Sequence, residues 1–272
     1  MPKVALSTDL NRNNWQHLDP INDSVPGMSV DKAYTELIKD SEGQTVVVAV
    51  LDTGIDIKHE DLKGNIWTNK KEIPGNNIDD DKNGFVDDVY GWNFLGEAYY
   101  EQLELTRLLG KGEDFPEKED AQKDYDKRLA EARGEETLKY YLNYDFKGRT
   151  TGDDPDNFDQ TYYGDNKVEH SREDESHGTH VAGIIAAARN NNLGMKGVAN
   201  NVQIMTLRVV PYGDEYDKDI ALGIIYAADN GADIINTSFG KGFSPHSDKV
   251  RDAIAYAASK NVLIVNAAGN DN

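Results

Sequence analysis

Three polar side chains border apolar stretches of the sequence and together suit acid–base chemistry. Asp52 directly follows a β-branched run, His177 lies just before a stretch of small apolar residues, and Asn270 follows a short apolar run. A buried Asp that orients a His, which then acts as general base, makes two-thirds of a catalytic triad. An Asn amide placed after a strand is suited to donate to a developing oxyanion. These residue types therefore point to nucleophilic catalysis.

Taken singly, each of these residues also has a structural explanation. Asp52 alone would serve as a turn or helix-cap residue, and Asn270 is a common turn residue. His177 and His180 are spaced to share a metal, but the His-Glu-x-x-His pattern of metalloproteases is absent. The chemistry therefore depends on whether the fold brings the residues together.

The surrounding sequence alternates between strand-like and helix-like segments. The first strand is apolar throughout, as expected of a strand that is buried on both faces. Such alternation predicts an α/β fold, with a parallel sheet flanked by helices, and places the ligand site at the carboxyl ends of the strands. The expected strands are 45–51, 202–210, 232–236 and 262–265, and the expected helices are 181–188, 217–230 and 248–260.

Composition excludes several classes of function. The 272 residues carry a formal net charge of −20, and this acidity argues against nucleic acid and against an anionic membrane surface as partners. No run of about 18 apolar residues exists, so no membrane span is expected. Cysteine is absent, which removes disulfides, thiolate zinc sites and cysteine nucleophiles. Residues 1–7 contain no apolar core of a signal peptide.

Four blocks in order resemble the subtilisin-like serine proteases (subtilases, peptidase family S8). They are residues 48–56 around Asp52, 177–183, 233–240 and 267–270. The order Asp, His, Ser belongs to the description of that family and is not worked out from this sequence. The resemblance implies a subtilisin-like three-layer fold with a parallel sheet, incomplete at the C-terminus and interrupted by a helical, acidic insertion.

The resemblance also assigns roles to individual residues. Asp52 would orient the imidazole, and His177 would act first as general base and then as the acid that protonates the leaving amine, with His180 structural. Asn270 would donate to the oxyanion. The backbone of Ser238, Phe239 and Gly240 would bind a protein or peptide substrate as an extra strand.

The same resemblance divides the chain into four parts. The insertion is the most charged of them. Its sequence predicts one or two exposed helices followed by an irregular acidic stretch, and most of its charges are expected to form a solvated face. Its place between the Asp and His blocks predicts a position near the rim of the cleft, where it would limit access or anchor other parts. The parts are an N-terminal extension with the first helix of the protease domain (1–43), the Asp block and acidic loop (44–96), the charged insertion (97–175), and the His block to the oxyanion Asn (176–272).

No serine of the sequence lies in the Gly-Thr-Ser-Met-Ala-like block that carries the family's nucleophile. We therefore expect that the chain is truncated before that block and is inactive alone. In the parent protein, a C-terminal segment that is missing here would carry the catalytic Ser. Two alternatives are a non-catalytic peptide-binding pseudoprotease and one half of a split protease. A purely structural calcium-binding domain would explain the acidic loop described next but not the His block or Asn270.

The acidic loop 76–88 predicts a calcium site. Alternate oxygen ligands followed by Gly84 match the first half of a calcium loop, although Tyr90 stands where an EF-hand needs Glu. A solvated acidic turn is the alternative, but closely spaced Asp residues repel one another without a cation. The candidate ligands are Asp79, Asp81, Asn83, the Phe85 carbonyl, and Asp87 or Asp88.

A second calcium site is implied by the resemblance alone. The Asn191 side chain and the carbonyls of Arg189, Leu193 and Met195 would bind the ion, joined by the Asp61 carboxylate. Millimolar calcium is normal outside cells, so two such sites favour a secreted, periplasmic or cell-surface protein.

Overall fold

A five-stranded, all-parallel sheet forms the centre of the computed structural model, which describes residues 14–39, 41, 43–170 and 172–270. The segment 1–7, examined for a signal peptide, and the first 13 residues of the predicted N-terminal extension lie outside the described residues. The strand order is β2-β3-β1-β4-β5. The strands are β1 (Val46–Asp52), β2 (Gly91–Asn93), β3 (Val202–Arg208), β4 (Ile234–Thr237) and β5 (Leu263–Asn266).

The predicted α/β class is confirmed, and β1 lies in the middle of the sheet because its residues are apolar on both faces. Ala49, Val50 and Leu51 are fully buried. Four strands were expected close to where they occur. The sequence analysis missed β2, since three residues are too few to show a period.

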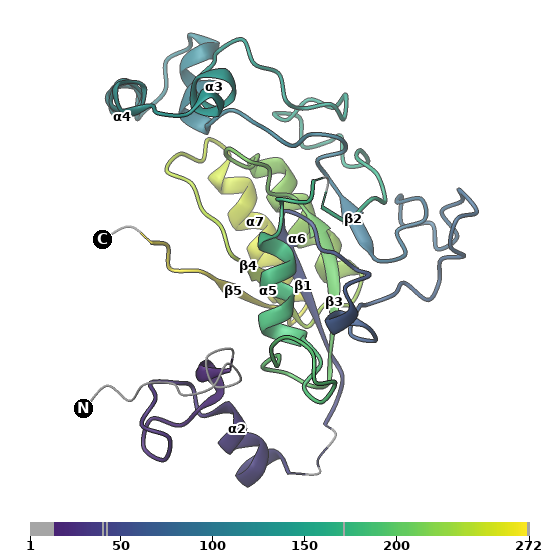
Figure 1. The fold of residues 1–272 in the computed structure, drawn as a ribbon. Coiled ribbons are helices and arrows are strands. Elements are labelled where there is room, and N and C mark those ends of the chain that lie inside the picture. Colours follow the sequence, from purple (N-terminus) through teal and green to yellow (C-terminus); the bar gives the residue numbers. More distant parts are fainter. Residues whose placement is uncertain (1–13, 40, 42, 171, 271–272) are drawn as a thin grey trace.

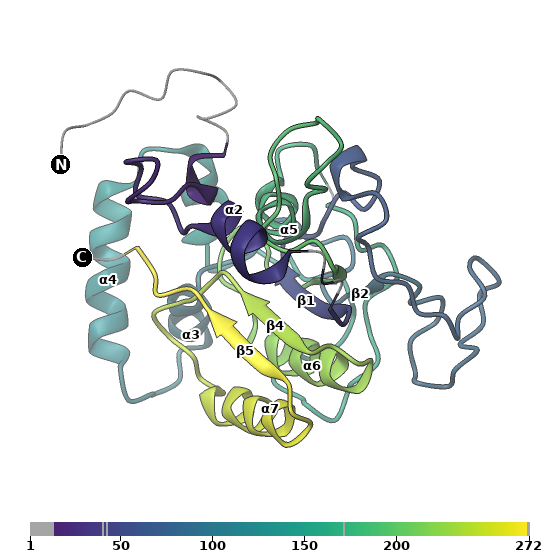
Figure 2. The ribbon, with the colours of Figure 1, turned by 90° about the horizontal axis from the view of Figure 1, so that it is seen from below.

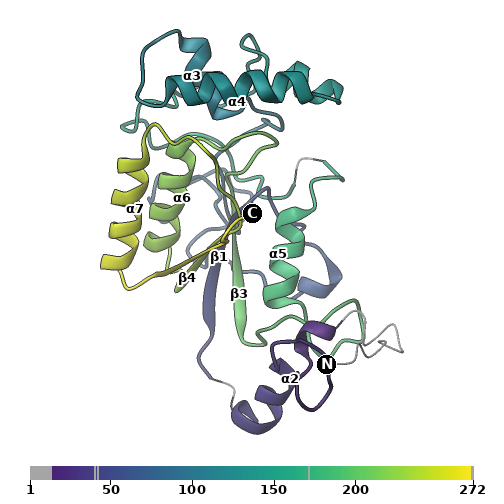
Figure 3. The same cartoon turned by 90° about the vertical axis from the view of Figure 1, so that its left-hand side faces the viewer.

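Helices cover both faces of this sheet (Figure 1). α5 (His177–Ala186) packs on one face, while α6 (Asp217–Asp229) and α7 (Ser247–Ser259) lie on the other, as Figure 3 shows. α5 begins four residues before its predicted start, so His177 is its first residue. The further helical segments are η1 (Trp15–His17), α2 (Val30–Ala33), η2 (Tyr34–Ile38), η3 (Glu60–Leu62), α3 (Glu104–Lys111), α4 (Lys118–Glu131) and η4 (Thr137–Tyr141).

The termini of the described chain lie at different places around this core. Figures 1 and 3 show α2 beyond the lower end of α5, on the opposite side of the molecule from α3 and α4, and Figure 2 shows the same core from below, with β5 as the last strand of the sheet. Among the described residues, no helix is both long enough and apolar enough to cross a membrane.

The charged segment 97–175 lies over the carboxyl edge of the sheet, with α3 and α4 as its outermost layer (Figure 3). It joins the edge through main-chain hydrogen bonds. The Glu101 N–H donates to the Tyr212 carbonyl at 2.7 Å, and the Tyr212 N–H donates to the Tyr99 carbonyl at 2.8 Å. Gly213 permits this pairing, because its φ is +115° and a Cβ there would lie 2.1 Å from the Glu101 carbonyl oxygen.

Buried ion pairs fix the same segment on the sheet, which differs from the solvated face expected for most of its charges. Lys241 Nζ lies 2.7 Å from Glu104 and 3.0 Å from Asp217, and all three side chains are almost fully buried. Arg107 contacts Glu104 at 2.6 Å. The expectation of exposed charge holds for most of α4, while the first turn of α3 is buried among counter-charges.

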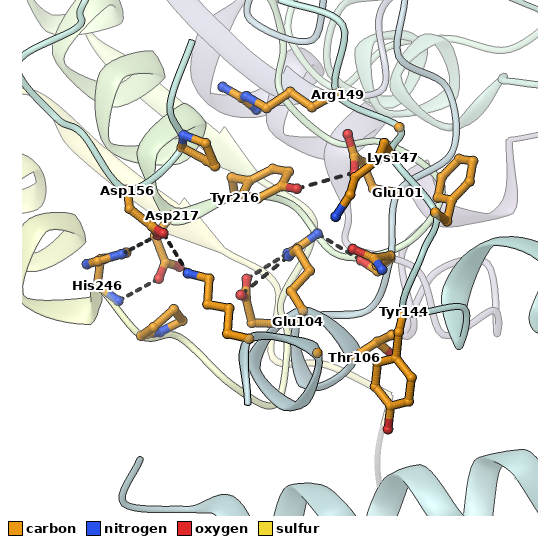
Figure 4. A pocket seen from close by; sticks show the side chains of 18 of the residues that line it. Glu101, Glu104, Thr106, Tyr144, Lys147, Arg149, Asp156, Tyr216, Asp217 and His246 are labelled. Atoms are coloured by element: carbon orange, nitrogen blue, oxygen red, sulfur yellow. Dashed lines mark hydrogen bonds and ion pairs between the residues drawn. The ribbon is translucent and has the colours of Figure 1, made fainter. Parts of the chain in front are cut away.

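A cavity of about 530 Å³ lies between α3, residues 144–156 and the start of α6 (Figure 4). Glu101 lines it and is 2% exposed. The Tyr216 hydroxyl donates to Glu101 Oε2 at 3.4 Å. Burial raises the pKa of Glu101 to about 7, although the Arg107 and Arg149 guanidinium groups act in the opposite direction.

We expect Glu101→Gln to change how stability depends on pH. The folded state keeps a proton on Glu101 that the unfolded chain releases above its ordinary pKa of 4.5. The contribution of Glu101 to the free energy of unfolding therefore falls as the pH rises from about 4.5 to about 7, and it stays constant at higher pH. The neutral amide removes this contribution. Urea unfolding should show the variant matching the wild type near pH 4.5 and exceeding it by about 3 kcal/mol at pH 8. Glu119→Gln, an exposed change on α4, is the control; equal pH curves for wild type and Glu101→Gln would contradict the expectation.

Candidate active site

Asp52 and His177 meet at the carboxyl edge of the sheet. Asp52 ends β1 and His177 begins α5, and the carboxylate Oδ1 lies 2.8 Å from the imidazole Nδ1. The Asp52 side chain is 2% exposed, whereas that of His177 is 58% exposed. The carboxylate is therefore shielded from water, while the imidazole is open to an approaching molecule. A proton on Nδ1 directed at Asp52 leaves Nε2 free to act as base.

Glycine after the histidine makes this contact possible. A Cβ at Gly178 would lie 2.3 Å from the Gly54 carbonyl oxygen and 3.2 Å from Asp52 Cβ. The Gly178 N–H donates to Thr53 Oγ1 at 3.2 Å, and the Thr53 N–H donates to Asp52 Oδ1 at 2.8 Å. The start of α5 can approach the end of β1 only because position 178 has no side chain.

A buried ion pair lies behind the Asp–His pair. Arg208, the β3 partner of Asp52 in register, donates from Nε to the Thr53 carbonyl at 3.0 Å. Its Nη2 lies 3.2 Å from Glu175 Oε1, and both side chains are fully buried. Glu175 stands two residues before His177, so the pair joins the end of the sheet to the loop that delivers the imidazole. Sequence reasoning missed both residues; a charged residue inside the apolar run 202–210 was the available signal.

Ser238, Phe239 and Gly240 follow β4 and line a cavity of about 700 Å³. Asn270 lines the same cavity from the segment after the neighbouring strand β5. The structure thus brings the expected substrate strand and the expected oxyanion donor to one cleft. Ser238 Oγ accepts a hydrogen bond from Asn236 Nδ2 at 3.0 Å. Among the described residues, no hydrogen bond joins Asn270 to His177.

The acidic loop brings two of the expected carboxylates, Asp79 and Asp81, together with a third that was not expected. Glu72, Asp79 and Asp81 each offer an oxygen atom, and these atoms lie within 4.8 Å of one another. Glu72 was missed because it lies upstream of the loop pattern. The Asp79 carboxylate also accepts the N–H groups of Asn83 and Gly84, so it closes the tight turn of the loop.

The last two carboxylates of this loop support the fold. Asp87 accepts the N–H groups of Gly75 at 2.8 Å and Asn77 at 2.7 Å, one on each oxygen. Asp88 is fully buried, and burial raises its pKa. It accepts hydrogen bonds from Tyr226, Asn69 and Asn83. Phe85 anchors the loop by packing its ring edge-on against Trp92 and Tyr226.

The second expected calcium loop lies against Asp61. Asp61 is buried, and its Oδ1 accepts from Asn191 Nδ2 at 2.7 Å. The Leu193 N–H donates to Asn191 Oδ1, and a Cβ at Gly194 would lie 2.8 Å from Asp61 Oδ2. The Arg189 side chain turns away to Asp31 and the Gly197 carbonyl, and Met195 follows at the end of the loop.

We expect Glu175→Gln to destabilise the fold, because it leaves the Arg208 charge buried without its counter-charge. The free energy of unfolding should fall by about 3 kcal/mol, as measured by urea titration. Glu173→Gln, an exposed change in the same loop, should stay within about 0.5 kcal/mol of the wild type. Equal losses in the two variants would show that the ion pair is not what holds this loop.

Comparisons with known proteins agree with this geometry. The chain is 45% identical over 97 residues to the thermophilic serine proteinase of Bacillus sp. (strain AK1). This match covers 35% of this chain and 24% of that protein. It is 27% identical over 242 residues to subtilisin-like protease 1 of Plasmodium berghei (strain Anka), and this match covers 86% of this chain and 28% of that protein. It is 44% identical over 100 residues to the cell wall-associated protease of Bacillus subtilis (strain 168), and this match covers 36% of this chain and 11% of that protein.

A solved structure, the epidermin leader peptide processing serine protease of Staphylococcus aureus, matches with a TM-score of 0.45 and 20% identity. The match covers 98% of this chain and 45% of that one. The chain therefore spans about a quarter of the first two curated relatives and about half of that structure. The family model described as the subtilase family matches residues 43–272, which is most of the sequence. The chain belongs to the subtilase family.

Proposed function

We propose that this chain supplies the acid–base pair and the substrate-binding strand of a serine endopeptidase. The observation that carries the proposal is the 2.8 Å contact between the buried Asp52 and the exposed His177. A general base needs a fixed orientation and an accessible nitrogen, and this pair offers both.

Each residue then has one role in peptide hydrolysis. His177 takes the proton of a serine hydroxyl as its oxygen attacks the peptide carbonyl, and the Asn270 amide donates to the oxyanion that forms. His177 next gives that proton to the leaving amine, which leaves an acyl-enzyme. Water deacylates it with His177 again as base. Asp52 stays ionised throughout, holds the Nδ1–H tautomer and stabilises the imidazolium.

The serine nucleophile is proposed to lie on a segment outside these 272 residues, so that this chain alone is inactive. Ser238 is hydrogen-bonded within its own loop, and among the described residues no serine hydroxyl is hydrogen-bonded to His177. A peptide-binding pseudoprotease has no use for a buried carboxylate aimed at an exposed imidazole, so the Asp52–His177 contact favours an enzyme. A half enzyme completed by a second chain would use the same residues.

We expect Asp52→Asn, made in the full-length protein, to lower kcat for a chromogenic peptide about 10⁴-fold, because the amide stabilises the wrong imidazole tautomer. KM should change little, since Asp52 is buried and does not touch the substrate. Asp56→Asn, a partly exposed change in the same block, should keep activity within about two-fold. Near wild-type activity in Asp52→Asn, with circular dichroism showing it folded, would reject the proposed mechanism.

Calcium stabilisation is a second part of the proposal. Glu72, Asp79 and Asp81 fit a hard cation, because three carboxylates crowd within 4.8 Å and each is an oxygen ligand. Burial raises the pKa of Glu72, and a nearby cation would favour its ionised form. At the second loop the Asp61 carboxylate and the Asn191 side chain already touch, and the Arg189, Leu193 and Met195 carbonyls would complete the set. Two such sites suit the calcium of an extracellular or cell-surface location.

We expect calcium at about 100 times its Kd to raise the Tm by roughly 5–10 °C, because ligand that binds only the folded state adds about 2.7 kcal/mol. Asp79→Asn combined with Asp81→Asn should remove most of the shift. Asp114→Asn, an exposed change in the insertion, should keep it. If calcium still raised the Tm of the double variant by the full amount, this loop would not be the stabilising site.

A further inference from the structure

Helix α4 of the insertion forms one wall of the cleft that contains the proposed substrate strand. The cavity of about 700 Å³ is lined by residues 238–243 and 266–270, by Asp214, and by four residues of the insertion, which are Leu103, Leu105, Asp124 and Arg128. A second cavity of about 430 Å³ continues along α4, past Glu131, to Gly213. Leu103 and Arg128 line both cavities, so Arg128 borders each of them.

The wall is held firmly against the substrate strand. Lys241, which directly follows Gly240, reaches Glu104 at the start of α3 at 2.7 Å. Phe243 packs against the small core that α3 and α4 share around Leu105 and Tyr125. A peptide that pairs with residues 238–240 therefore meets α4 at a fixed distance.

Apolar and cationic side chains both line this cleft. Leu103, Leu105 and Phe239 contribute apolar side chains to the first cavity, and Arg128 lines it beside them. A substrate that lies along residues 238–240 can therefore contact the Arg128 guanidinium.

Arg128 offers donors to such a side chain. It is half exposed, and its Nε donates to Asp124 at 2.9 Å, which fixes the plane of the guanidinium. Among the described residues, the terminal nitrogens of Arg128 have no hydrogen-bond partner. A guanidinium has five N–H groups, and its free edge matches a carboxylate in two parallel hydrogen bonds.

The other cations that line these cavities are already engaged. Lys241 is 5% exposed and is paired with Glu104 and Asp217. Arg133 donates from Nη1 to the carbonyls of Ala130 and Ala132. Within the described residues, Arg128 is thus the lining cation best placed to receive a ligand.

We propose that Arg128 is a specificity-determining residue that selects a carboxylate side chain on the substrate. This inference rests on the proposed endopeptidase function and names the substrate class of the same site: an extended peptide with an Asp or Glu at the position that meets Arg128. Asp124 holds the guanidinium in the orientation that this contact requires.

The test compares full-length wild type and Arg128→Glu on peptides that carry Glu or Lys at each position in turn. At one position we expect the wild type to cleave the Glu peptide about 10-fold better in kcat/KM, as one charge-assisted contact at a half-exposed site allows. Arg128→Glu should reverse this preference through KM with kcat little changed. Arg128→Lys should keep part of it.

Lys127→Glu is the matched control, because it makes the same charge change at the next residue of α4, outside both cavities. It should leave the preference as in the wild type. A preference that survives Arg128→Glu, or that Lys127→Glu alters equally, overturns the role of Arg128 while leaving the endopeptidase intact. Failure of the wild type to cleave any peptide would instead reject the proposed function.

Discussion

The close approach of two backbones, at the end of β1 and the start of α5, is the constraint on which the site depends. Position 178 must be glycine, because any side chain there would meet the Gly54 carbonyl and Asp52 itself. With glycine in place, the Asp52 carboxylate stays buried while the His177 ring projects into solvent. The parallel sheet contributes by ending β1 and β4 side by side, so that the acid–base pair and the substrate strand lie at the same edge of the sheet.

Buried charge performs a similar positioning role around this edge. The pair of Arg208 and Glu175 joins β3 to the loop before α5, and Lys241 joins the substrate strand to α3. Such pairs contribute little net stability over apolar packing, but losing one partner is costly, so they favour a single arrangement. The insertion is thereby part of the cleft, because Asp124 and Arg128 of α4 line it.

Local patterns predicted four of the five strands, and the ordered blocks that resemble the subtilases predicted the candidate catalytic pair. The apolar run before Asp52 and the blocks around His177 and Asn270 are contiguous in sequence, so each is visible without a structure. Partners that the fold supplies from a distance were not visible. Glu175 and Arg208 are separated by 33 residues, and only the β1–β3 register places Arg208 opposite Asp52.

The insertion shows the same limit, because buried and solvated charges look alike in a sequence. Glu104 and Arg107 belong to the insertion, most of whose charges were expected to be solvated. Both are buried, because their partners Lys241 and Glu215 come from segments far along the chain. Glu72 likewise joined the acidic cluster only through the path of the loop.

The most direct test of the central claim, that Asp52 and His177 activate a serine, is fluorophosphonate labelling of the full-length protein followed by mass mapping of the adduct. We predict one adduct, on a serine outside residues 1–272, whose rate of formation falls at least about 10³-fold in His177→Ala. No adduct, or an adduct whose rate is unchanged in His177→Ala, would contradict the claim.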